Sequence, residues 1–130
     1  QEKSSKKLPI EVEENITASF TEVLDIFISI CKIKNIEPIL LTQPSRFSDE
    51  SLEKLITQFL PRDITYKEIA RLHKKHNQII RAYGNKGVKI IDLENGIPSN
   101  NKNFMDVMHF SDDGNKLAAE IIFDQLILKK

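Results

Sequence analysis

An aspartate and a histidine stand three residues apart in the segment DVMHFSDDG, at Asp106 and His109. A histidine that acts as a general base needs an acceptor at one ring nitrogen, which fixes the tautomer. Its second ring nitrogen must be free for the proton that it removes. A carboxylate three residues earlier on a tight turn can be that acceptor. The spacing therefore predicts that Asp106 orients His109 as a catalytic base.

The residues that follow this pair indicate the start of a helix, which would hold the pair in place. Ser111 is a good N-cap, Asp112 and Asp113 suit the positive end of a helix, and Gly114 permits a close approach of the first turn to its neighbours. The same pattern is equally typical of helix capping without any chemistry. The sequence leaves both interpretations open.

The elements that must position these residues follow from the hydrophobic pattern. Apolar residues recur every three or four positions from residue 16 to about residue 34, which predicts a long amphipathic helix. Short apolar runs at 37–43 and 88–93 predict two buried strands. Three further helices are expected: a short one over 52–60, one opened by a capping box at Thr65 and Glu68 and stopped by Gly84, and a last one over about 112–128.

This alternation of helices and apolar strands is typical of a parallel α/β sheet. Two strands that are apolar on both faces do not make a stable sheet alone, because sheets usually contain about five strands and each unpaired edge is a liability. We therefore expect the missing strands to come from an N-terminal part of the same domain or from another chain.

Further polar residues follow the two predicted strands. Ligands of open parallel sheets bind beyond the carboxyl ends of the strands, where TQPSRF follows the first strand and Asp92 ends the second. Asp92 is interpreted as a loop-capping carboxylate or a site residue. Arg46 can pair with an acidic substrate group, although an exposed arginine after a proline turn usually has no specific role.

Three other residues have side chains that can bind metals or react. His73 and His76 lie three apart on one predicted helix, but no third metal ligand is evident, and Lys74 and Lys75 indicate a solvated edge. We expect no metal site there. Cys31 is the single cysteine and falls in an apolar stretch, so we predict a buried thiol and no internal disulfide.

The composition narrows the function classes. The chain has 130 residues, which fits a single domain over 1–130 or the C-terminal portion of one. Lys plus Arg and Asp plus Glu both number 19, so no charge excess favours nucleic acid as a partner. No apolar run approaches the length of about 18 residues that a membrane span needs. The lysines at the beginning belong to a predicted flexible start over 1–9.

The segment DVMHFSDDGNKLAAEII resembles the last block of the SGNH hydrolases, also called the GDSL family, in which an Asp-x-x-His pair precedes a helix. IEPILLTQPSRF and KGVKIIDLENG resemble strands near the end of that fold. The resemblance extends from about residue 16 to residue 127. It is most specific at Asp106, His109 and Gly114.

This resemblance implies an α/β fold, a three-layer α/β/α sandwich with a parallel sheet (flavodoxin-like), of which the chain holds the C-terminal strands and helices. It implies that His109 is the base and Asp106 the third member of a Ser-His-Asp triad that acts on carboxylic esters without a cofactor. The nucleophilic serine and the oxyanion residues of the family have no counterpart here. No nucleophile is assigned, and the chain alone is not expected to hydrolyse esters.

Two functions remain open from the sequence. The first is the C-terminal part of an esterase, lipase or deacetylase-like enzyme, with a small ester or acylated molecule as substrate. The alternative is a non-catalytic α/β module that binds a carbohydrate or recruits a partner through its sheet edge. A nucleotide-binding domain is disfavoured because no glycine-rich phosphate loop follows either strand.

Overall fold

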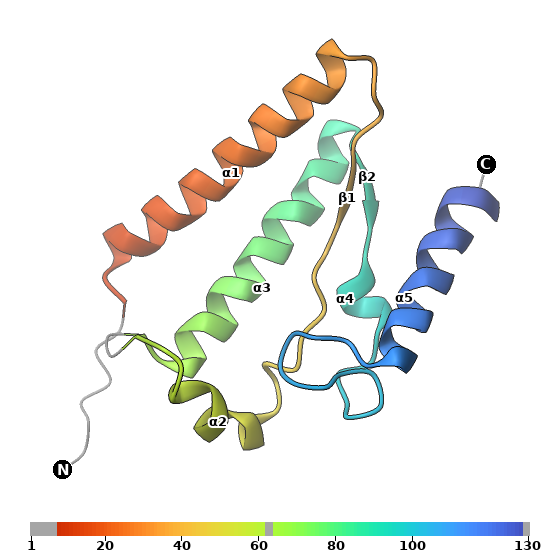
Figure 1. Ribbon diagram of the computed structural model, residues 1–130. Helices are drawn as coiled ribbons and strands as arrows, with labels where there is room; N and C mark the ends of the chain where they lie inside the picture. Colours follow the sequence, from red (N-terminus) through yellow and green to blue (C-terminus); the bar gives the residue numbers. More distant parts are fainter. Residues whose placement is uncertain (1–7, 62–63, 129–130) are drawn as a thin grey trace.

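The computed structural model describes residues 8–61 and 64–128. Within them, helices flank a two-stranded parallel sheet (Figure 1). Residues 1–7 of the predicted flexible start lie outside the described residues. Leu8 is buried, and Pro9 directly precedes the first helix.

The sheet consists of β1 (Ile39–Leu41) and β2 (Lys89–Ile91), aligned so that Leu40 lies opposite Ile90. The prediction of two short parallel strands is confirmed, although both are shorter than the apolar runs that indicated them. The second run ends early because Asp92 caps a short helix, α4 (Leu93–Gly96), that the sequence did not predict.

Two long helices cover one face of this sheet (Figure 1). The first, α1 (Ile10–Ile33), begins six residues earlier than the periodicity predicted, directly after Pro9. The second, α3 (Tyr66–Ala82), opens with the expected capping box, in which Thr65 and Glu68 bond to each other's backbone. This α-helix ends at Ala82 with Tyr83 as its C-cap, so Gly84 directly follows the end of the helix, close to the predicted stop. A 3₁₀ turn, Tyr83–Lys86, continues the chain to Gly87, whose φ of 80° suits a residue without a side chain.

The opposite face of the sheet is covered by α5 (Asp112–Phe123), which continues as five residues of π-helix, Asp124–Leu128. The remaining helical pieces are a 3₁₀ turn, Glu50–Leu52, and α2 (Glu53–Thr57), which replace the single predicted helix over 52–60.

Side-chain alternation along the strands divides the core into two clusters. Leu40 packs with Ile28, Tyr83 and Val88 beneath α1 and α3. On the other face, Ile91 is fully buried in a cluster with four further buried residues and the apolar side of α5; the four are Leu93, Ile97, Phe104 and Ala118. The coarse α/β class is therefore observed, with helices on both faces of the small sheet. Cys31 is buried and unpaired, as predicted.

Candidate functional site

The segment that carries Asp106 and His109 forms a narrow loop between β2 and α5. Phe104 and Phe110 pair as an isolated antiparallel bridge, and the backbone N–H of Met105 donates to the carbonyl of His109 over 2.9 Å. Asp106 Oδ1 closes the tip of the loop by accepting the backbone N–H groups of Met108 and His109, each at 2.8 Å. The three-residue spacing thus forms a turn that returns the histidine to the carboxylate.

The two side chains of this turn are in direct contact. His109 Nδ1 lies 2.7 Å from Asp106 Oδ2. Burial alone would raise the pKa of Asp106, but hydrogen bonds from the His109 and Met108 amides and from the His109 ring outweigh it and lower the pKa to about 2. Asp106 is therefore a carboxylate at neutral pH, which is the form that can orient an imidazole.

The far side of the imidazole faces solvent, because the His109 side chain is 76% exposed and that of Asp106 is 41% exposed. No hydrogen bond from another described residue reaches Nε2 of His109. An imidazole held at Nδ1 and open at Nε2 can remove a proton from a hydroxyl group or a water molecule. No described serine bonds to this ring, so no nucleophile is in place within the part of the chain that the structure describes.

The loop is fixed to α5 by the residues that the sequence singled out. Ser111 caps the helix by accepting the Gly114 N–H at 3.2 Å, and its own hydroxyl donates to the carbonyl of Lys102. Gly114 lies against the backbone of the same loop, where a Cβ would come within 2.0 Å of the Asn103 carbonyl oxygen. The predicted cap and the close approach of Gly114 are both confirmed.

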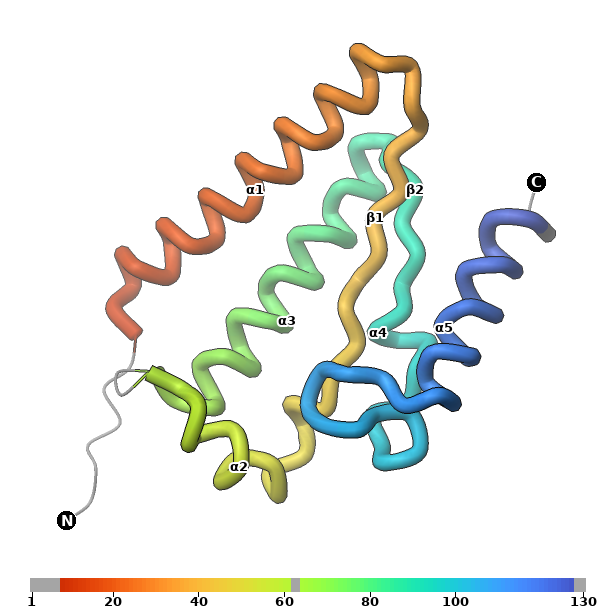
Figure 2. The backbone as a smooth tube through the Cα atoms, viewed as in Figure 1, coloured from red at the N-terminus to blue at the C-terminus, as the bar shows by residue number. Residues whose placement is uncertain are grey.

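A second segment supports the loop from the other side. The Arg46 N–H donates to the carbonyl of Val107 over 2.7 Å, so the chain after β1 lies beside the loop that carries His109 (Figure 2). The Arg46 side chain is buried and pairs with Asp49 at 2.5 Å, and the Tyr66 hydroxyl bonds to the backbone carbonyls of both residues. The expectation of an exposed arginine was wrong, because Tyr66 and the ion pair draw this segment into the protein.

Asp92 belongs to a separate network at the ends of the strands. Its carboxylate accepts a hydrogen bond from Thr42 at 2.7 Å and two from Arg81 at 2.7 and 2.9 Å, and it caps α4. The hydrogen bonds from Arg81 are the main reason that the pKa of Asp92 lies well below its ordinary value. The capping role is confirmed, and no contact joins Asp92 to Asp106 or His109. Arg81 lies eleven residues before Asp92, a separation that carries no periodic signal.

His73 and His76 are half-buried, and not fully solvated as the sequence suggested. Phe47 packs against the His73 ring at 5.2 Å, and Phe20 stacks on the His76 ring at 4.4 Å. The Nε2 atoms of both histidines are buried without a hydrogen-bond partner, and burial lowers both pKa values. Lys74 and Lys75, which lie between them, suggested that both rings are solvated, but the two phenylalanines cover part of each ring. No group of three metal-binding side chains occurs among residues 8–61 and 64–128.

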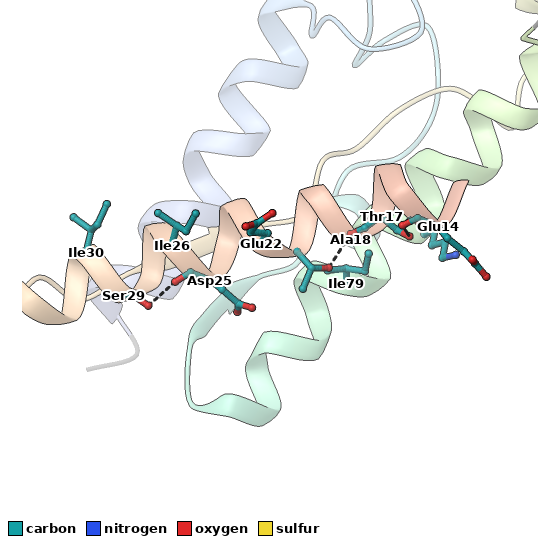
Figure 3. A pocket seen from close by; sticks show the side chains of 11 residues that line it. Glu14, Thr17, Ala18, Glu22, Asp25, Ile26, Ser29, Ile30 and Ile79 are labelled. Atoms are coloured by element: carbon teal, nitrogen blue, oxygen red, sulfur yellow. Dashed lines mark hydrogen bonds between the residues drawn. The ribbon is translucent and has the colours of Figure 1, made fainter. Parts of the chain in front are cut away.

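A hollow of about 790 Å³ lies away from the Asp106 and His109 pair. It runs along α1 between residues 14 and 30, with Lys75 and Ile79 of α3 at its side (Figure 3). Its walls carry the carboxylates of Glu14, Glu22 and Asp25 but no histidine or cysteine. None of the predicted site residues lines it.

Comparison of the chain with protein-family models, with curated proteins and with solved structures finds no match. Over the residues that the structure describes, no helix combines the length and the apolar character needed to cross a bilayer.

Proposed function

We propose that this chain is the C-terminal part of an SGNH-type serine hydrolase acting on carboxylic esters, in which His109 is the general base and Asp106 orients it. The observation that carries the proposal is the 2.7 Å contact between His109 Nδ1 and Asp106 Oδ2, with the other side of the ring open to solvent. In this reaction a serine hydroxyl attacks the ester carbonyl while His109 takes its proton. His109 then returns the proton to the leaving alcohol, and water releases the acyl group by the same route.

We also propose that further strands complete a three-layer sandwich. The open edge of β1 supports this part of the proposal. The Thr42 N–H donates to the Ile91 carbonyl at 3.1 Å, so the backbone groups of Thr42 and of Leu40, two residues earlier, point toward β2. The backbone groups of Ile39 and Leu41 therefore point away from β2, toward the edge where the sheet ends. A third parallel strand placed there would pair with them.

The surface of α1 carries a second unpaired feature. Ile16, Val23, Phe27 and Ile30 recur at helical spacing and remain exposed. A monomeric soluble domain rarely leaves so continuous an apolar stripe uncovered. The proposed additional part of the domain would provide a surface that covers this stripe.

Ester hydrolysis by the longest natural protein that contains this chain tests the proposal. We expect His109→Ala to lower kcat for p-nitrophenyl acetate by roughly 10²-fold to 10⁴-fold, because a positioned base contributes about that much. Met105→Ala is the matched control, since Met105 lies on the same loop and its side chain is 73% exposed. Near wild-type activity of His109→Ala would remove the histidine from the mechanism.

A non-catalytic binding module is the second candidate, favoured by the lack of a serine against His109 in the described residues. The two candidates differ in one result. The binding module predicts no hydrolysis above buffer by the natural protein, with no change on His109→Ala. The hydrolase predicts turnover that the substitution abolishes.

A further inference from the structure

A second hollow, of about 510 Å³, lies beyond the carboxyl ends of both strands. Its walls come from the segment after β1, the segment after β2, and α3. Among the lining residues are Ser45, Phe47, Ser48, His73, Glu94 and Ser99. Ligands of open parallel sheets bind in this position, and the volume lies in the range of about 300–1,000 Å³ that is typical of ligand pockets.

One wall of this hollow is aromatic and firmly supported. The half-buried Phe47 ring packs against Tyr66 at 5.6 Å and against His73 at 5.2 Å between ring centroids. Tyr66 is itself buried and anchored by its hydroxyl. A supported aromatic ring offers a flat apolar surface on which another ring can stack.

The charges that line the hollow are largely compensated. The Glu94 carboxylate is held by Arg81 at 2.6 Å, and the Arg71 guanidinium is held by Glu13 at 2.5 Å. Lys74 is then the lining cation for which no ion pair occurs in the described residues. A multiply charged anion such as a phosphate is usually bound by several cations, so this lining does not suit a phosphate.

Hydroxyl groups dominate the remaining polar surface. Ser45, Ser48 and Ser99 line the hollow, and the hydroxyls of Ser48 and Ser99 lie 3.3 Å apart. A hydrocarbon chain in the hollow would leave these groups without hydrogen bonds, at a cost in free energy. A ligand with several hydroxyls, each both donor and acceptor, would satisfy them.

We infer that this hollow binds a neutral saccharide ring, stacked by its apolar face on Phe47 and hydrogen-bonded at its edge to the three serines. The inference rests on the proposed function in one respect: in a hydrolase, the hollow holds the alcohol part of the ester. The substrate is then an O-acylated sugar, and the unacylated sugar binds in the same place without reacting.

Titration of the ¹⁵N-labelled protein by NMR spectroscopy tests the inference with three probes: methyl β-D-glucopyranoside, hexanoate and inorganic phosphate. Saturable shifts of the amides of Phe47, Ser48 and Ser99 are expected with the glucoside, and none with the other two probes. Phe47→Ala should weaken the glucoside by roughly tenfold, the loss expected from removing a ring stack. Phe59→Ala is the matched control, because Phe59 is 78% exposed and lies outside the hollow.

Saturation by hexanoate or phosphate at these amides, or no saturable shift with the glucoside, overturns the inference. If Phe47→Ala loses spectral dispersion, Ser99→Val provides the second test, because Ser99 is exposed and its replacement removes one hydroxyl without emptying the core. Unchanged glucoside affinity in a folded variant would be equally negative. Binding is measured without turnover, so glucoside binding without ester hydrolysis refutes the proposed function alone, and hydrolysis without glucoside binding refutes the saccharide site alone.

Discussion

Replacement of Gly114 by alanine tests whether α5 holds the His109 loop through a direct backbone contact. The new Cβ would lie 2.0 Å from the Asn103 carbonyl oxygen, 2.9 Å from the Asn103 carbonyl carbon and 3.1 Å from the Phe110 ring. A rotamer change cannot relieve contacts with backbone atoms. The loop and the helix must therefore separate, although the contact between them is what fixes the position of Phe110 and its neighbour His109.

The magnitude of this effect follows from two opposing terms. Forcing extra volume into a packed site costs about 1–3 kcal/mol, and a backbone overlap this short belongs at the upper end. Alanine regains up to about 1 kcal/mol of helix propensity relative to glycine. The free energy of unfolding should therefore fall by about 2 kcal/mol, which lowers the urea midpoint by about 1 M for a typical slope of about 2 kcal/mol/M.

Urea unfolding followed by circular dichroism measures this loss. Gly84→Ala is the control, because its Cβ would meet only the Ile90 side chain at 3.4 Å, an ordinary contact distance. The control should unfold within about 0.5 kcal/mol of the wild type. A Gly114→Ala variant as stable as the control would refute the contact between α5 and the loop on which the site geometry depends.

Two further predictions concern the hydrogen bonds around the sheet and the site. Asn77→Ala should lower the free energy of unfolding by about 2–4 kcal/mol in urea titrations, because the 1% exposed amide donates to the Gln43 carbonyl and accepts its N–H. An unchanged urea midpoint would contradict the stabilising role of these two hydrogen bonds. The lowered pKa of Asp106 contributes stability above its ordinary value of 3.8, and the contribution is lost as the pH falls through about 2. The full shift would amount to about 2 kcal/mol, which solvent screening of a half-exposed side chain reduces to about 1 kcal/mol. Asp106→Asn should therefore be destabilised by that amount at pH 5 and match the wild type near pH 2, whereas a difference that persists at pH 2 would contradict the assignment.

Local sequence signals predicted the helix caps and the Asp106 turn well. The capping box at Thr65, the N-cap at Ser111 and the close approach of Gly114 each depend on residues within a few positions of one another. The Asp106 and His109 contact is of the same kind, because a three-residue turn brings the two side chains together. Such features can be predicted because the residues that form them are close together in the sequence.

Features that depend on distant parts of the chain were predicted poorly. Arg46 is buried because Tyr66, twenty residues later, bonds to its carbonyl. The His73 and His76 rings are half-buried because Phe47 and Phe20, from other elements, pack against them. No local pattern carries such information, since the burial of a side chain depends on which remote segments pack over it.

Labelling of the natural protein with a fluorophosphonate, which reacts with activated serine nucleophiles, tests whether His109 serves a serine hydrolase. We expect one labelled serine outside residues 1–130, located by mass spectrometry of the digested protein. It also predicts that labelling is lost in His109→Ala and kept in Met105→Ala. No labelled serine in the wild type, or undiminished labelling in His109→Ala, would contradict the claim that His109, oriented by Asp106, is the base of a serine hydrolase.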